Sequence, residues 1–279
     1  MKNRNFYSKL IKKAKFVIIV GLIITVIHLI HALTLDKIVV FNEFEFFSYN
    51  LPQDMNGYRV AFVTDPHYVN LQTLQSIVEE LNERNIDLLL LGGDFARTRD
   101  ILEQSMEVLA GTNTTDGIFG VEGNHDSLLI LATVKEANGI GFLVDEGFHV
   151  REGFFLAGVR DRWRGRPDVA QSIYGSNPDD FILLLSHQPD VVMEQSTVGI
   201  DLILSGHLHG GQITFFGILA PALLFPFVTD YGQRFMTGFS ESLDGVPIYT
   251  SRGVGHMNPN HMFRVFARPE VVIFTLYSK

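Results

Sequence analysis

Short apolar runs alternate with amphipathic stretches along the first half of the chain, and this order limits the folds that the chain can form. The runs have the length of strands, and the amphipathic stretches carry their apolar residues at helical spacing. Strand-like and helical stretches follow one another at 58–64, 71–81, 87–91, 101–109, 117–121 and 128–137. This β-α-β-α-β-α order predicts an α/β fold with a mainly parallel sheet.

The second half of the chain is mostly strand-like. One helical stretch lies near 168–174, and the strand-like runs are 154–159, 181–185, 201–204, 236–239, 246–251 and 271–277. Two facing sheets with helices outside them would account for both halves. The length of 279 residues is sufficient for one large domain with a well-filled core.

The amino end has a composition of its own. Residues 1–15 carry six cations and no acid, and residues 16–35 carry no charge at all. About twenty apolar residues are enough to cross a bilayer, so we predict a transmembrane anchor at 16–35. A buried core helix is disfavoured because the run is apolar on every side. A cleaved signal peptide is disfavoured because the run is too long and no Ala-x-Ala site follows it.

The cations also predict how the chain sits in a cell membrane. Under the positive-inside rule, 1–15 is a basic cytoplasmic end and everything after 35 lies on the other side. We therefore expect a single-pass membrane protein, with a connecting segment at 36–57 and an extracytoplasmic domain at 58–279.

Charge and cysteine content exclude several function classes. Removing the six amino-terminal cations from the 22 in the chain leaves 16 against 31 acids, a formal charge of −15. A surface this acidic disfavours binding to nucleic acid. The chain has no cysteine, so disulfides, thiolate metal sites and cysteine nucleophiles are excluded.

Five short polar motifs stand where apolar runs end. They are Thr64-Asp65-Pro66-His67, Gly92-Gly93-Asp94, Gly123-Asn124-His125-Asp126, Ser186-His187 and Gly206-His207-Leu208-His209. The carboxyl ends of strands in an α/β sheet are where such folds build their sites. Each motif by itself is most simply a turn or a helix cap, but their joint occurrence at successive strand ends predicts one cluster. Imidazole, carboxylate and amide ligands without thiolate suit manganese, iron or zinc.

These motifs resemble those of the calcineurin-like metallophosphoesterase family. The stretches 207–212 and 249–255 resemble its membrane-anchored bacterial branch, and the resemblance covers residue 58 to the carboxyl end. It implies a four-layer αββα sandwich of two mixed sheets flanked by helices. It also implies hydrolysis of a phosphodiester or pyrophosphate by a hydroxide that bridges two divalent metal ions. We expect manganese first, with iron and zinc as alternatives.

The resemblance further implies a role for each motif residue. One metal ion would be held by Asp65, His67 and His209, and Asp94 would bridge it to the second. The second ion would be held by Asn124, His187 and His207. His125 would act beside the phosphate, with Asp126 as its orienting partner.

The substrate signals are weaker. An uncharged apolar stretch, 213–228, follows the last metal-binding histidines, and is either a packed loop or a lip that faces lipid. Arg160, Arg162, Arg164 and Arg166 form an alternating basic loop that is either solvated or meets a phosphate group. We hypothesise a membrane-proximal or lipid-linked phosphoester as substrate.

Two alternatives stay open. The first is hydrolysis of UDP-2,3-diacylglucosamine at its pyrophosphate in lipid A synthesis, which the predicted topology disfavours because that substrate is cytoplasmic. The second is a membrane-tethered metal-binding protein without turnover.

Overall fold

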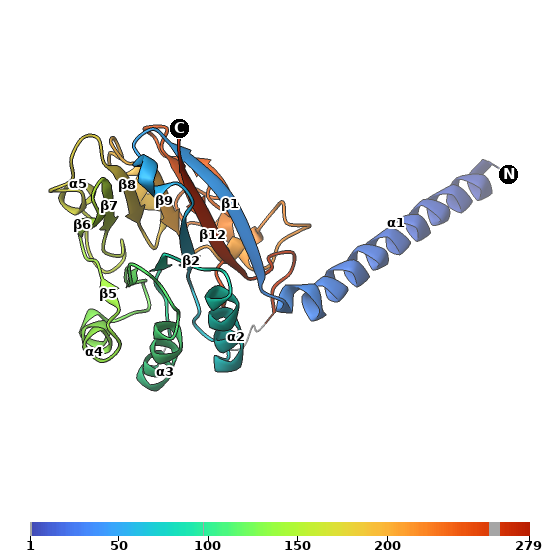
Figure 1. Ribbon diagram of the computed structural model, residues 1–279. Coiled ribbons are helices and arrows are strands. Elements are labelled where there is room, and N and C mark those ends of the chain that lie inside the picture. Colours follow the sequence, from blue (N-terminus) through green and yellow to red (C-terminus); the bar gives the residue numbers. More distant parts are fainter. Residues whose placement is uncertain (1, 97, 257–262) are drawn as a thin grey trace.

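The computed structural model describes residues 2–96, 98–256 and 263–279. It contains two six-stranded sheets packed together, and a long helix, α1 (Lys2–Leu33), that extends away from them (Figure 1). Among the described residues, α1 is the one helix long and apolar enough to cross a membrane. It also includes the basic residues of the amino end, and a single 3-10 turn, η1 (Leu35–Lys37), joins it to the sheets.

The first sheet carries most of the helices. Its strand order is β1-β12-β2-β3-β4-β5, and all neighbours are parallel except β12 and β2. The strands are β1 (Val40–Ser48), β2 (Tyr58–Val63), β3 (Leu88–Leu91), β4 (Ile118–Gly120), β5 (Gly141–Phe142) and β12 (Glu270–Ser278). Its outer face is covered by α2 (Leu71–Asn82), α3 (Arg99–Ala110) and α4 (Leu128–Asn138) (Figure 1).

The second sheet has the order β10-β11-β9-β8-β7-β6, with antiparallel strands at its two edges. Its strands are β6 (Glu146–Arg151), β7 (Phe154–Gly158), β8 (Phe181–Leu185), β9 (Leu202–Ser205), β10 (Gly238–Glu241) and β11 (Pro247–Thr250). Its outer layer is thin and consists of short helical turns and loops. These turns are α5 (Val169–Ser172), η3 (Pro189–Met193) and η5 (Pro221–Leu224).

Three apolar clusters fill the spaces between the layers. One lies under α2 and α3, one lies between the sheets, and one lies beneath the short turns of the second sheet. Every residue of β3 and of β8 is buried, because each strand is covered on both faces, and this explains their unbroken apolar runs. The predicted arrangement of two mixed sheets flanked by helices is confirmed.

The prediction of a connecting segment at 36–57 is wrong for most of its length. The segment contains β1 and the 3-10 turn η2 (Gln53–Met55), and β1 pairs along its whole length with β12. Phe44 and Phe46 pack on the cluster between the sheets, whereas Glu43 and Glu45 face outward. This alternation with a period of two is the sequence signal of a half-buried edge strand.

Candidate metal centre

All seven predicted ligands lie at the carboxyl ends of neighbouring strands. Three of these strands, β2, β3 and β4, are adjacent in the first sheet, and β8 and β9 are adjacent in the second. The residues that follow them are Asp65 and His67, then Asp94, then Asn124, then His187, and finally His207 and His209. The two sheets therefore bring motifs that are far apart in sequence to one buried place.

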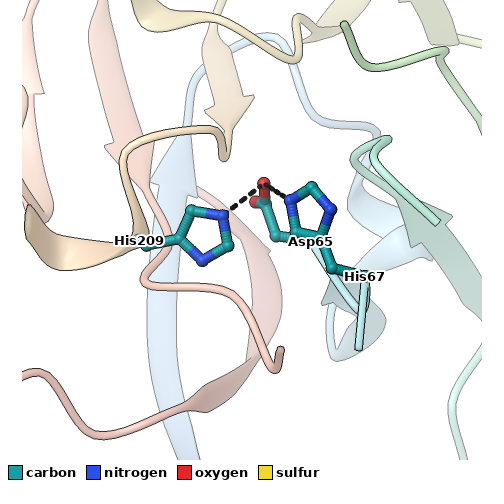
Figure 2. Close-up of side chains that lie close together, drawn as sticks. All are labelled: Asp65, His67 and His209. Carbon is teal, nitrogen blue, oxygen red and sulfur yellow. Dashed lines mark ion pairs between the residues drawn. The ribbon is translucent and has the colours of Figure 1, made fainter. Parts of the chain in front are cut away.

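The first group consists of Asp65, His67 and His209. Figure 2 shows both imidazoles directed at the same carboxylate oxygen, Asp65 Oδ1. His209 Nε2 lies 3.4 Å from this oxygen and His67 Nε2 lies 3.8 Å from it. Within the described part of the chain, Asp65 Oδ1 is buried without a hydrogen-bond donor, and burial raises the pKa of Asp65. A carboxylate buried in this way needs a cation beside it to stay ionised.

The second group consists of Asp94, His187 and His207, with Asn124 next to them. His187 Nε2 is 3.3 Å from Asp94 Oδ2 and 3.2 Å from Asn124 Oδ1. His207 Nε2 faces the carbonyl oxygen of Val228 at 3.0 Å, which leaves its Nδ1 free to bind a metal. Burial, together with the nearby His187, lowers the pKa of His207 to about 3, so its ring is neutral at pH 7.

Asp94 joins the two groups. Its Oδ2 lies 3.3 Å from His67 Nε2 in the first group and 3.3 Å from His187 Nε2 in the second. Burial alone would raise the pKa of Asp94, but His187 and His67 outweigh it and hold the pKa well below its usual range. Asp94 is thus an ionised carboxylate in the position that a bridge between two cations requires.

The hydrogen bonds of His187 test whether a cation fits here. Its Nδ1 is 2.7 Å from the carbonyl oxygen of Gly92, which can only accept, so Nδ1 carries a proton. On a neutral ring Nε2 then has a lone pair and no proton. It nevertheless points at two further acceptors, Asp94 Oδ2 and Asn124 Oδ1. Burial opposes a charged ring, but Asp94 raises the pKa of His187 well above its usual value, so that without a metal a proton on Nε2 takes the place of the cation. The donor set therefore fits a metal ion, and the bond to Gly92 is the backbone contact that metal-binding histidines ordinarily make.

Five of the seven predicted ligands have left-handed backbone conformations. Such a conformation costs a residue other than glycine on the order of 1–3 kcal/mol. The φ angles are 54° at Asp65, 37° at His67, 57° at Asp94, 68° at His207 and 50° at His209. Gly123 has a related role, because a Cβ there would lie 2.3 Å from Asp94 Oδ1. Strain concentrated in this way marks a functional site rather than a set of ordinary turns.

His125 and Asp126 lie beside the ligands, and their backbone and side chains tie the site loops together. The His125 amide donates to Asp94 Oδ1 at 2.7 Å, and its ring lies 5.5 Å from that of His67. The buried Asp126 carboxylate accepts the backbone N–H groups of Asp94, Phe95 and Gly123 at 2.7, 3.0 and 2.8 Å. Burial and the charge of Asp94 raise the pKa of Asp126 to about 7. These bonds make Asp126 the link between the loop after β3 and the loop after β4.

Replacing Asp126 by asparagine is expected to destabilise the protein. Asparagine offers one acceptor oxygen, so at least one of the three backbone donors loses its partner, which costs about 1–3 kcal/mol. For a domain of this size that corresponds to a fall of several degrees in unfolding midpoint, measured in detergent. Asp168→Asn is the matched control, because Asp168 caps α5 at the surface and asparagine caps equally well. An Asp126→Asn protein that melts like its parent would contradict this role.

A cavity of about 180 Å³ opens onto the ligands. Its wall includes His125, then Phe227 and Val228 from the apolar stretch 213–228, and Trp163, which the sequence did not indicate. Trp163, the single tryptophan of the chain, stands edge-on to His207 with ring centroids 5.0 Å apart. That the chain has one tryptophan is the only sequence feature that could have drawn attention to Trp163. A larger hollow of about 490 Å³ between α3 and α4 contains none of the metal-centre residues.

Arg264 is a further buried residue that the sequence did not indicate. Its guanidinium lies 3.2 Å from His209 Nδ1 and donates to the carbonyl oxygens of Arg252 at 2.7 Å and Ala267 at 3.1 Å. Burial lowers the pKa of Arg264 to about 10, so it remains charged at pH 7. Arg264 is thus a fixed cation behind the predicted ligand His209, whose Nε2 is directed at Asp65.

Two of the four arginines in the alternating basic loop form ion pairs within the protein. Arg160 pairs with Asp145 at 2.5 Å, and Arg162 pairs with Glu194 and Asp230 at 2.6 Å each. These ion pairs fasten the loop that carries Trp163.

Comparison with known proteins agrees with this geometry. The model of the calcineurin-like phosphoesterase family matches residues 58–211. The metallophosphoesterase YkuE of Bacillus subtilis is 26% identical over 245 residues, covering 82% of each chain. The phosphodiesterase YaeI of Escherichia coli is 30% identical, covering 78% of this chain and 82% of its own.

A relative from Danio rerio, a transmembrane protein with a metallophosphoesterase domain, is 26% identical over 81% of this chain. The chain spans 54% of that protein's length and 54–61% of the length of some bacterial relatives. The family match covers more than half of the chain and includes all five motifs. The chain therefore belongs to the calcineurin-like phosphoesterase family.

Proposed function

We propose that this protein is a membrane-anchored phosphoesterase that hydrolyses a phosphodiester or pyrophosphate with two divalent metal ions. The observation that carries the proposal is Asp94 Oδ2, which lies at the same 3.3 Å distance from a histidine of each ligand group. A carboxylate shared in this way is what two cations about 3.5–4 Å apart require.

The predicted ligands form two groups, one for each metal ion. Asp65, His67 and His209 would hold one ion, and His187, His207 and Asn124 the other, with Asp94 between them. When bound, two divalent ions supply Lewis acidity and activate water at neutral pH. Two carboxylates leave such a pair with excess positive charge, which draws a phosphate anion into an otherwise acidic protein. The ligand set suits manganese first, and also iron or zinc.

The remaining residues of the cavity act on the substrate. His125 lines the cavity and its backbone is fixed by Asp94, so its imidazole is placed to donate a proton to the leaving oxygen or to the phosphate. Asp126 positions His125 indirectly, through the loops that it joins. Trp163 and Phe227 provide an apolar rim that contacts the group attached to the phosphate.

The anchor places this chemistry at a membrane. We assign α1 to a single span of the cell membrane, with its basic end in the cytoplasm and the metal centre on the other side. A membrane-proximal or lipid-linked phosphoester is the substrate class that fits this position.

The first test is hydrolysis of bis-p-nitrophenyl phosphate by the full chain in detergent. We expect turnover with added manganese, none with a chelator, and recovery when metal is restored. The metal content should be two ions per chain, measured by elemental analysis. A folded protein that binds two ions but turns over neither this diester nor a pyrophosphate would instead be a metal-binding protein without turnover.

A further inference from the structure

Residues 213–227, which we call the lip, form an exposed apolar surface beside the metal centre. The stretch 213–228 contains no charged residue. Seven large apolar side chains of the lip are between 40% and 78% exposed: Ile213, Phe215, Ile218, Leu219, Leu224, Phe225 and Phe227. A concentration of this size on one segment marks a contact surface rather than scattered surface residues.

The lip is packed against the transmembrane helix. The ring of His28 in α1 lies 5.4 Å from Phe215, 4.6 Å from Phe216 and 5.0 Å from Phe266. His31 stacks on Phe266 at 3.8 Å. In Figure 1 the orange segment that includes the lip lies on the side of the sheets from which α1 extends.

A buried carboxylate fixes this contact. Asp36, just after α1, accepts the backbone N–H groups of Phe266 at 2.9 Å and Ala267 at 3.2 Å. It also lies 3.1 Å from His31 Nδ1. Asp36 therefore holds the end of α1 against Phe266 and Ala267. Phe266 in turn packs on Phe216 of the lip, with ring centroids 5.2 Å apart.

The contact also sets the depth of the lip. The uncharged run 16–35 ends in η1, and its α-helical part ends at Leu33, five residues after His28. At about 1.5 Å per residue, His28 lies about 8 Å inside the end of α1 along the helix axis. Because the run 16–35 has the length of the hydrocarbon core, side chains level with His28 lie within one lipid monolayer. Phe215 and Phe216 are at this level.

Both ends of the lip connect to the metal centre. Residue 213 comes four positions after the ligand His209, and Val228 holds the ligand His207 through its carbonyl oxygen at 3.0 Å. Phe227 and Val228 also line the cavity. Phe227 is thus part of both the exposed lip and the wall of the cavity.

We propose that the lip inserts into the lipid monolayer next to α1, so that the cavity opens at the bilayer surface and takes a phosphoester whose acyl chains stay in the membrane. This inference deepens the proposed function and rests on it for the substrate class. The insertion itself is independent of turnover and can be measured separately.

Because the chain has no cysteine, a single introduced cysteine can be labelled specifically to test the insertion. Single variants Ile218→Cys and Leu224→Cys, in the full chain, are labelled with the fluorophore NBD and reconstituted in phosphatidylglycerol–phosphatidylcholine nanodiscs. Tyr174→Cys is the control: Tyr174 is 80% exposed and follows α5, on the side of the sheets away from α1 (Figure 1). Lipids with a nitroxide on the acyl chain should quench the two lip labels at least several-fold more than the control.

Two outcomes would overturn the insertion. The first is lip labels that acyl-chain nitroxides quench no more than the Tyr174 label. The second is disulfide cross-linking of Leu224→Cys between two chains, which would identify a second copy as the occupant of this surface.

The substrate class is tested by comparing turnover of two probes in the same nanodiscs. The first is the soluble bis-p-nitrophenyl phosphate, and the second is a p-nitrophenyl phosphodiester of diacylglycerol. Ile218→Asp should lower turnover of the lipid probe several-fold and leave the soluble probe unchanged, and Tyr174→Asp should change neither. Equal effects on both probes would overturn the substrate class. No turnover of either probe by the parent chain would count against the proposed function, whereas the quenching result would still decide the insertion.

Discussion

Replacing Asp94 by asparagine is expected to lower turnover of bis-p-nitrophenyl phosphate by at least about 1,000-fold, because one ionised oxygen serves both ligand groups. Asparagine keeps the size of the side chain and can still accept the His125 amide, so the loops should stay folded. It removes the negative charge that offsets the repulsion between two divalent ions. Metal content should therefore fall below two ions per chain, which elemental analysis would show.

The control for this variant is Asp180→Asn. Asp180 is also a buried carboxylate paired with a histidine, His149, at 2.8 Å, but it lies outside the metal centre. The same chemical change there should leave turnover and metal content as they are. An Asp94→Asn protein that keeps two ions and near-parental turnover would rule out a bridging role for Asp94.

The sequence predicted the strands around the metal centre because their signals are local. β2, β3 and β4 are apolar runs, and each is followed directly by its ligands, so a strand and its site residues are recognised together. Parallel pairing between successive strands then brings the ligands to one edge.

The parts that the sequence did not indicate depend on contacts between distant residues. β1 pairs with β12, more than 200 residues later, and its alternating glutamates and phenylalanines make sense only beside that partner. Arg264 has no local signal either, because the carbonyl oxygens and the histidine that it meets belong to separate loops.

The apolar stretch after His209 shows a different kind of ambiguity. From the sequence alone, residues 213–228 are either a packed loop or a lipid-facing surface, and composition is the same in both cases. In the structure the stretch is packed in part and exposed in part, because Ala220 and Leu223 are buried against the outer face of the second sheet while their neighbours are exposed. The contact between His28 and Phe215 is the observation from which we infer the use of the exposed part, and no sequence pattern contains it.

His125→Ala is expected to lower turnover by about 100- to 10,000-fold without loss of metal, because a positioned acid contributes about that much to proton transfer. The predicted ligands do not include His125, and its backbone bond to Asp94 survives the substitution. Two ions per chain should therefore remain. His149→Ala is the control, since that histidine binds Asp180 away from the metal centre.

The leaving group shows what His125 does. A p-nitrophenolate departs without a proton, whereas an alkoxide needs one, so a residue that protonates the leaving oxygen matters more for an alkyl ester. We therefore expect His125→Ala to lose more turnover on an alkyl phosphodiester than on bis-p-nitrophenyl phosphate. Equal losses on both would mean that the ring stabilises the phosphate oxygens instead, and unchanged turnover on both would remove His125 from the mechanism.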